Sequence, residues 1–402
     1  MEIGVGISTE KNQQLAIREA IQTAKMSITA NTVDFALVFG TAEFSYAGVL
    51  KTIASFLPGT SVIGSSSPAI ISNKGVFEHG LAIMLIKYSE EIQYHTGYAV
   101  DIRRKDSVKA GEEFGEKICT GFHQIPRSAG LIFYNSSMAE GGNFSSGLQE
   151  KIGRSFPLIG AFVSNGIHAM HTQLYFNQEV FNDSCVGVLW GGKLTYSLGV
   201  RHGWKPLGKP HTITSSVGNI VAKIDDEPAA MLYSNYLGFD LSRLRKELKH
   251  ISVFYPLGLS LQGEKEYLLR NILSIENDGS LICQGNVPEQ STVRVMIGTP
   301  ETCLDAAEQA TEDALQNFTL PPLGAKKGKI KRCAIVLSSY SRYVFLKRQI
   351  TQEAERIKKK LGNDISMIGI YTSGELAPLR ASSYRGQLYF HNQTITVLLI
   401  GG

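Results

Sequence analysis

Residues 62–68 have the sequence VIGSSSP, and this pattern decides the fold because the chain repeats it twice. In each copy an apolar run ends in Ile-Gly and continues into a loop of small residues that is rich in hydroxyl groups. The later copies are LIGAFVSNG at residues 158–166 and MIGIYTSGE at residues 367–375. Long self-similarity of this kind is more informative about architecture than any short motif.

The similarity continues on both sides of the Ile-Gly copies. An apolar strand is predicted before each copy, at residues 35–40, 131–137 and 334–339. An amphipathic helix is predicted before each of those strands, at residues 15–25, 108–118 and 303–315. After the last two copies, the sequence Gln-Leu-Tyr-Phe leads to a strand that ends in Gly-Gly. The repeated unit is therefore strand, helix, strand, loop and helix, strand, hairpin and strand.

These units predict an α/β fold, because uninterrupted apolar strands alternate with amphipathic helices. They are too long and too unevenly spaced for a solenoid. We expect two lobes built from duplicated strand-helix-strand-hairpin units, with mostly buried sheets. We also expect Gly64, Gly160 and Gly369 to occupy equivalent positions in the repeated units.

Composition is that of an ordinary globular protein. The chain has 402 residues, of which 43% are hydrophobic and 19% charged, enough for two domains with sizeable cores. The net charge of +4 is too small to predict binding to nucleic acid. No apolar run approaches the roughly 18 residues of a membrane span, so we expect no membrane partner.

Cysteine use and the N-terminus predict a cytoplasmic protein. The five cysteines form no Cys-x-x-Cys pair, which argues against a structural zinc site and against a disulfide framework. The first residues, MEIGVG, contain no basic region and no signal-peptide core.

A corner rich in glycine and proline predicts the boundary between the two lobes. Residues 201–208 have the sequence RHGWKPLG and follow an apolar strand. We place an N-terminal domain at residues 1–202 and a C-terminal domain at residues 203–402.

Enzyme motifs are missing from the sequence, so we expect no catalytic activity. It contains no His-Glu-x-x-His, no Gly-x-Ser-x-Gly and no Ser-x-x-Lys. A triad that the fold assembles from distant residues stays open, because triads are defined by geometry and not by sequence order.

Several short stretches together give the chain a family likeness. They are residues 62–68, the corner at 203–208, Gly218-Asn219 leading to Ile224-Asp225, Pro228-Ala229, residues 371–378, and His391-Asn392. In this order they resemble the two-part FIST proteins, with an N-terminal FIST domain and a FIST C-terminal domain. The resemblance implies a signal-input protein that binds a small ligand.

One bacterial branch that the chain resembles consists of haem-binding nitric-oxide sensors. Such sensors act on a partner histidine kinase, as in two-component systems, or on a cyclic-di-GMP enzyme, either a diguanylate cyclase or a phosphodiesterase. Because no kinase, cyclase or helix-turn-helix signature is present, we expect the output to lie in a separate partner. Whether the protein forms a homodimer stays open.

Haem b is the cofactor that this resemblance implies, and His202 has the best neighbourhood for its iron. Gly203 leaves room for a flat ring, Trp204 supplies an apolar edge, and Arg201 or Lys205 can pair with a propionate. A structural role for a histidine in a linker is the alternative. The second choice is the pair His168 and His171, which lie three residues apart.

The alternative ligand is a small polar metabolite, such as an amino acid, bound without haem. Its pocket would be lined by the Ile-Gly loops, at Ser65, Ser66, Ser67, Ser164, Asn165, Ser373 and Glu375. Glu375 is the charged residue among small ones and would face an amine. A role in anchoring its own turn is equally open for Glu375.

Overall fold

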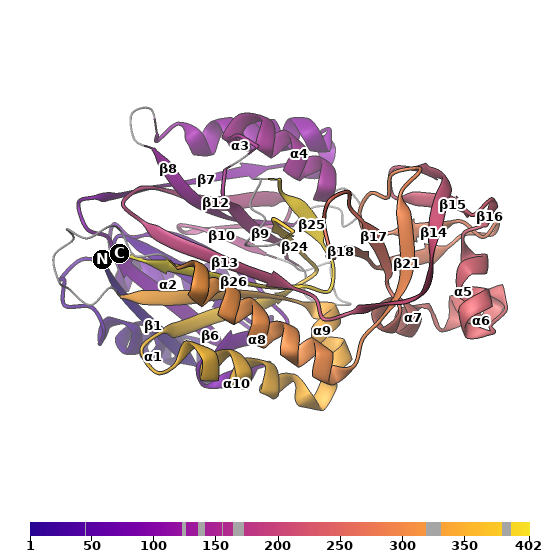
Figure 1. The fold of residues 1–402 in the computed structure, drawn as a ribbon. Helices are drawn as coiled ribbons and strands as arrows, with labels where there is room; N and C mark the ends of the chain where they lie inside the picture. Colours follow the sequence, from indigo (N-terminus) through magenta and orange to yellow (C-terminus); the bar gives the residue numbers. More distant parts are fainter. Residues whose placement is uncertain are drawn as a thin grey trace.

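The computed structural model describes residues 1–44, 46–122, 126–135, 141–154, 156–163, 173–318, 331–379 and 387–402. The chain forms a larger body, built from three sheets, and a smaller lobe with one antiparallel sheet (Figure 1). The mixed α/β class predicted from the sequence is confirmed.

The first two sheets of the body have the same plan. The first runs in the order β1 (Glu2–Ser8), β6 (Leu81–Lys87), β2 (Phe35–Gly40), β3 (Ser61–Ser66), β10 (Leu174–Phe176) and β11 (Glu179–Phe181). The second runs in the order β7 (Ile92–Val100), β12 (Ser184–Gly192), β8 (Arg127–Tyr134), β9 (Leu158–Phe162), β24 (Gly374–Ala377) and β25 (Tyr389–His391).

The third sheet repeats this plan with strands from both ends of the chain. Its order is β13 (Thr195–Arg201), β26 (Ile395–Gly401), β22 (Arg332–Ser339), β23 (Ser366–Thr372), β4 (Ile70–Ser72) and β5 (Gly75–Phe77). Each sheet therefore takes four strands from one repeated unit and a hairpin from another. The exchange is cyclic: the first unit gives its hairpin to the third sheet, the second unit to the first, and the third unit to the second.

The Ile-Gly glycines occupy equivalent positions, as predicted. In three parallel strand pairs, Gly64 lies opposite Val38, Gly160 opposite Ile132, and Gly369 opposite Val336. A Cβ atom at these glycines would lie 1.8, 2.7 and 2.3 Å from the carbonyl oxygen of the opposing residue. Glycine is needed because the strands leave no room for a side chain there.

Helices cover the outer face of each sheet, and the inner faces share one core. The pairs are α1 (Gln13–Lys25) with α2 (Tyr46–Phe56), α3 (Ser107–Cys119) with α4 (Gly141–Ile152), and α8 (Pro300–Asn317) with α10 (Ile350–Leu361). The shared core contains Phe39 from the first sheet, Phe133 from the second and Ile335 from the third. Both faces of these strands are buried, which explains their continuous apolar sequences.

The small lobe is an insertion between the first strand of the third unit and its helix α8. Its sheet runs β18 (Tyr267–Arg270), β17 (Leu257–Ser260), β21 (Thr292–Ile297), β14 (Lys205–Val217), β15 (Ile220–Ile224), β20 (Leu281–Cys283) and β19 (Ile272–Ile275), with β16 (Glu227–Pro228) paired to β15. Its helices are α5 (Ala230–Leu237), α6 (Leu241–Lys246) and α7 (Leu248–Phe254). Near α10 lie α9 (Tyr340–Leu346) and the short turn η4 (Lys347–Gln349), and η1 (Ile102–Arg104) precedes α3.

The spatial division therefore differs from the expected lobes at residues 1–202 and 203–402. The chain leaves the body after β13 and returns to it with α8, so the third unit starts before the expected boundary. The third unit belongs to the body because its strands β22, β23 and β26 are apolar on both faces. One face of their sheet packs in the core that the three sheets share, and helices cover the other face.

Candidate functional site

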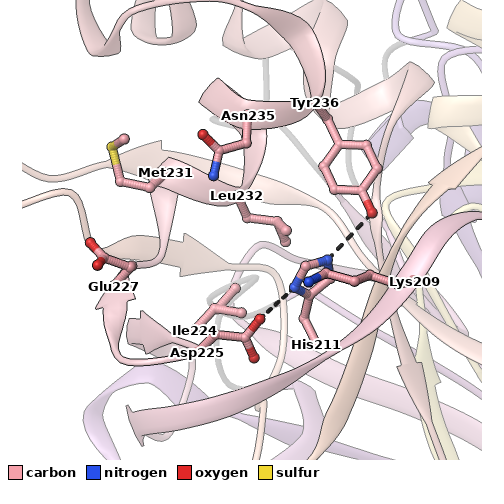
Figure 2. Close-up of a pocket in the computed structure, with 9 residues that line it drawn as sticks. All are labelled: Lys209, His211, Ile224, Asp225, Glu227, Met231, Leu232, Asn235 and Tyr236. Atoms are coloured by element: carbon pink, nitrogen blue, oxygen red, sulfur yellow. Dashed lines mark hydrogen bonds and ion pairs between the residues drawn. The ribbon is translucent and has the colours of Figure 1, made fainter.

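A cavity of about 430 Å³ opens on the small lobe, between the β14–β15 hairpin and helix α5 (Figure 2). This volume is within the range of small-molecule sites. Its walls are formed by Lys209, His211, Ile224, Asp225, Glu227, Met231, Leu232, Asn235 and Tyr236.

A tight turn after β15 holds Asp225 at the edge of this cavity. Asp225 and Asp226 both have left-handed backbone conformations, with φ of 50° and 66°. Aspartate tolerates this region better than most residues because its short side chain bonds locally. The Asp225 carboxylate accepts a hydrogen bond from the Thr212 backbone N–H at 2.8 Å, which joins the turn to β14.

His211 connects two of the lining side chains (Figure 2). Its Nδ1 lies 2.6 Å from an Asp225 oxygen, and its Nε2 lies 3.3 Å from the Tyr236 hydroxyl. The bond from the Thr212 N–H, together with His211, lowers the pKa of Asp225. The carboxylate is therefore ionised at neutral pH and accepts from Nδ1–H; in the neutral imidazole, Nε2 is then the acceptor for the Tyr236 O–H.

Gly208 makes room for Tyr236. A Cβ atom at position 208 would lie 2.0 Å from the tyrosine hydroxyl oxygen, and the backbone φ there is +69°. Both features require glycine. The register of β14 is irregular between Leu207 and His211, and this segment contacts Tyr236 of α5.

The cavity offers both signs of charge over an apolar floor. Lys209 and Tyr236 lie on one side of it, and Glu227 and Met231 on the other (Figure 2). Ile224 and Leu232 supply apolar surface between them. Such a site is suited to a ligand that carries an amine and a carboxylate a short distance apart.

His202, expected as a haem ligand, is instead part of the packed corner between body and lobe. Its side chain is 9% exposed, and its Nδ1 accepts a hydrogen bond from the Trp204 backbone N–H at 2.9 Å. Nε2 of the neutral ring therefore carries the proton and faces a Glu266 oxygen at 3.5 Å. Burial, offset in part by Glu266, lowers the pKa of His202 to about 4.

The residues around His202 do not fit a haem in this structure. The adjoining cavity is about 10 Å³, the space of a single water molecule. Arg201 is paired with Asp313 at 2.7 Å, and Trp204 packs on Phe345 with ring centroids 5.1 Å apart. Lys205 is exposed. The second-choice ligands, His168 and His171, lie outside the described residues, so haem binding there stays a prediction.

The Ile-Gly loops do come together, but their hydroxyl groups hold the exchanged hairpins. Ser67 Oγ bonds to the Tyr371 backbone, and Ser66 Oγ accepts from the Gln173 N–H at 3.0 Å. The Ser373 N–H donates to the Phe162 carbonyl at 2.8 Å. Ser65 is fully buried, and Ser164 and Asn165 lie outside the described residues. Ser66, Ser67 and Ser373 therefore have structural partners, whereas the buried Ser65 hydroxyl has no hydrogen-bond partner among the described residues.

Glu375 is buried among these loops. Its two oxygens accept hydrogen bonds from Thr372 at 2.5 Å and Thr394 at 2.6 Å. Burial raises the pKa of Glu375 to about 8, although both threonine bonds oppose that rise. These contacts with Thr372 and Thr394 match a role for Glu375 in anchoring its own turn, which was one of the two roles that the sequence left open.

Sequence reasoning assigned no role to His211, Lys209 or Tyr236. The signal that was present is the pair of turn aspartates after β15, together with Gly208. No sequence pattern indicated that α5 would bring Tyr236 to His211, because the two residues meet only through the packing of the lobe.

Metal and membrane features are absent from the part of the chain that the structure describes. No three histidine, cysteine or acidic side chains are grouped closely enough there to hold a metal ion. Among the described helices, none has the length and hydropathy needed to cross a membrane.

Comparison with known proteins identifies the family of this chain. The FIST N domain matches residues 34–227, and the FIST C domain matches residues 229–378. An uncharacterized protein of Mycobacterium tuberculosis (strain ATCC 25618 / H37Rv) is 23% identical over 389 residues, which cover 94% of this chain and 95% of the relative. An uncharacterized protein of Methanocaldococcus jannaschii is 22% identical over 62% of this chain and 50% of its own length. FIST domains are sensory domains, and the two matches together span most of the sequence, so the chain belongs to the FIST family.

Proposed function

We propose that this protein is the input component of a signalling system, and that the cavity around His211 binds its signal. The ligand is a small polar metabolite that carries both an amine and a carboxylate, as an amino acid does. The main evidence is the hydrogen-bonded series Asp225–His211–Tyr236. It holds hydrogen-bonding groups in fixed positions in a cavity that also contains a lysine and a glutamate.

Each part of the ligand has a matching group in the cavity. Lys209 is the cation for a carboxylate, and Glu227 is the anion for an ammonium group. The Asn235 amide can donate or accept, and Met231 adapts to side chains of different shape. Because His211 already holds the Tyr236 hydroxyl in place, the loss of side-chain entropy on ligand binding is smaller.

Family motifs support this location. Gly208 and Asp225 belong to the stretches on which the FIST resemblance rests, and both are needed for the shape of the cavity. Pro228, from the same stretches, lies in β16 beside Glu227. None of the three is needed by the haem prediction.

Haem, nitric oxide and the identity of the partner stay predictions from the family resemblance. A histidine kinase or a cyclic-di-GMP enzyme is the partner class that it implies. Ligand binding, and not catalysis, is the activity that we propose for the cavity.

The test is isothermal titration calorimetry of the purified chain with a panel of amino acids. Analogues lacking the amine or the carboxylate form the second arm. We expect saturable binding of at least one amino acid, and a loss of at least about tenfold in affinity for each truncated analogue.

Matched variants locate the site. Glu227→Gln and Lys209→Met are expected to weaken binding at least about tenfold. Glu289→Gln and Lys249→Met change exposed residues of the same lobe and are expected to leave affinity unchanged. Equal affinity in all four variants, or no binding by any amino acid, would overturn the proposal.

A further inference from the structure

The series Asp225–His211–Tyr236 has the arrangement that activates a hydroxyl nucleophile. In such a site a base lies within hydrogen-bond reach of the hydroxyl, and a third group orients the base. Here Nε2 of His211 lies 3.3 Å from the Tyr236 hydroxyl, and Nδ1 of the same ring lies 2.6 Å from Asp225. The three residues come from α5, from β14 and from the turn after β15. The fold therefore assembles a triad of the kind that the sequence left open.

Asp225 keeps His211 in the form that can remove a proton from Tyr236. The bond from the Thr212 backbone N–H, at 2.8 Å, lowers the pKa of Asp225 and holds its carboxylate in place. The ionised carboxylate accepts from Nδ1–H, so the lone pair of the neutral ring is on Nε2 and faces the Tyr236 hydroxyl. When the hydroxyl proton moves to Nε2, the same carboxylate stabilises the imidazolium that forms.

The side chains around Tyr236 favour an acyl group over a phosphoryl group. The cavity of about 430 Å³ is lined by one lysine, Lys209, and by two carboxylates, Asp225 and Glu227. This balance repels a phosphoryl group with several negative charges, whereas an acyl carbon is neutral. Ile224 and Leu232 supply apolar surface for a short acyl chain.

We propose that Tyr236 is a covalent modification site, which takes a short acyl group from a small thioester. The phenolic oxygen attacks the acyl carbon, and the bond between this carbon and the sulfur breaks. The hydroxyl proton passes to Nε2 of His211 and from there to the departing thiolate. The products are an acyl ester of Tyr236 and a free thiol, so no other reactant is needed. Lys209 lies on the same side of the cavity as Tyr236 (Figure 2) and is the cation for the negative charge that develops on the acyl oxygen.

This inference goes beyond the ligand binding proposed above and does not depend on it. Its test uses no amino acid, so acylation and amino-acid binding can succeed or fail separately. An acyl group on Tyr236 stays after the donor has left, and it gives a sensory protein a lasting sign that the donor was present.

The first test treats the wild-type chain with S-phenyl thioacetate and follows acetylation of each tyrosine by peptide mass spectrometry. Tyr98 is the reference, because it is 42% exposed and packs against Phe176 and Phe181. We expect Tyr236 to be acetylated at least about tenfold faster than Tyr98, although Tyr236 is the less exposed of the two. Neutral hydroxylamine cleaves tyrosine esters but not lysine amides, so it distinguishes acetyl-Tyr236 from acetylated lysine. Equal rates at the two tyrosines, or acetylation confined to lysines, would overturn the proposal.

The second test removes the base. His211→Gln is expected to lower the acetylation rate of Tyr236 at least about tenfold and to leave the rate of Tyr98 unchanged. His250→Gln is the matched control, because it changes an exposed histidine of the same lobe and is expected to keep the wild-type rate at Tyr236. A wild-type rate at Tyr236 in His211→Gln would overturn the proposal. If His211→Gln fails to fold, the comparison of Tyr236 with Tyr98 in the wild-type chain decides the question.

Discussion

Ser67 and Tyr371 lie 304 positions apart and are hydrogen-bonded through the serine hydroxyl. The serine hydroxyl accepts from the Tyr371 N–H at 3.1 Å, and it lies within donor distance of the Tyr371 carbonyl, at 3.0 Å, and of the Ala69 carbonyl, at 2.8 Å. Both residues are buried. The contact lies next to the first paired residues of β4 and β23, where the first unit's hairpin joins the third sheet. One serine side chain therefore connects two units from opposite ends of the chain.

Replacing Ser67 by alanine is expected to lower the free energy of unfolding by about 1–3 kcal/mol, because the buried Tyr371 N–H loses its acceptor. The measurement is the midpoint of urea unfolding. Ser55→Ala is the control: its hydroxyl donates to the Thr52 carbonyl on an exposed helix face, and the expected change is below about 0.5 kcal/mol. Equal effects of the two substitutions would show that the hairpin contact contributes little.

Gly64→Ala tests why each repeat has Ile-Gly. The new Cβ would lie 1.8 Å from the Val38 carbonyl oxygen, so strands β2 and β3 would have to separate. We expect a loss of about 3 kcal/mol in unfolding free energy. Gly48→Ala, in helix α2 with no atom near the new Cβ, is expected to stabilise the chain by up to about 1 kcal/mol. A neutral result at Gly64 would contradict the packing described at the Ile-Gly strands.

Glu375 predicts a dependence of stability on pH. Its folded-state pKa of about 8 exceeds the ordinary value of 4.5, so the folded protein retains a proton that the unfolded chain releases. Stability is therefore expected to fall as pH rises from about 4.5 to about 8, by an amount on the order of a few kcal/mol, and then to level off.

Glu375→Gln removes this titration and keeps both a donor and an acceptor for Thr372 and Thr394. We expect the variant to be more stable than wild type at pH 8, and the difference to shrink toward pH 5. Unfolding free energies across this range are the measurement, with Glu289→Gln at an exposed site as control. Parallel pH profiles for wild type and Glu375→Gln would rule out the raised pKa.

Gly208→Ala is expected to abolish ligand binding in the cavity around His211. The new Cβ would meet the Tyr236 hydroxyl at 2.0 Å and displace it from His211. Gly263→Ala is the matched control, since its φ of +80° carries the same backbone penalty, of about 1 kcal/mol, with no atom near the new Cβ. Amino-acid titration of both variants is the measurement. If Gly208→Ala still binds the ligand, the position of Tyr236 is not needed for binding.

Haem titration followed at the Soret band tests the assignment of His202. Because Nδ1 already accepts the Trp204 N–H and the adjoining cavity is about 10 Å³, we expect the same spectrum for wild type and His202→Ala. A wild-type band that the substitution removes would show that the corner opens to admit a ring. A band that both proteins share would direct attention to His168 and His171.

Local features of the small lobe could be predicted because they depend on neighbouring residues. The turn at Gly218-Asn219 joins β14 to β15, and Asp278-Gly279 joins β19 to β20, as the turn chemistry predicts. Thr299 caps α8 with a proline in its first turn, again as predicted.

The sequence by itself determined the α/β class, the repeated unit and the equivalence of the three Ile-Gly glycines, because each follows from local periodicity or from a close approach between adjacent strands. Only the tertiary structure decided which sheet each hairpin joins, since β4 and β24 have the same alternation whichever unit they pair with. It also decided the partners of His202, His211 and Arg270. Their chemistry depends on burial and on hydrogen-bond partners from distant segments, such as the Tyr236 hydroxyl for His211 and the Phe390 carbonyl for Arg270, and no local pattern records those contacts.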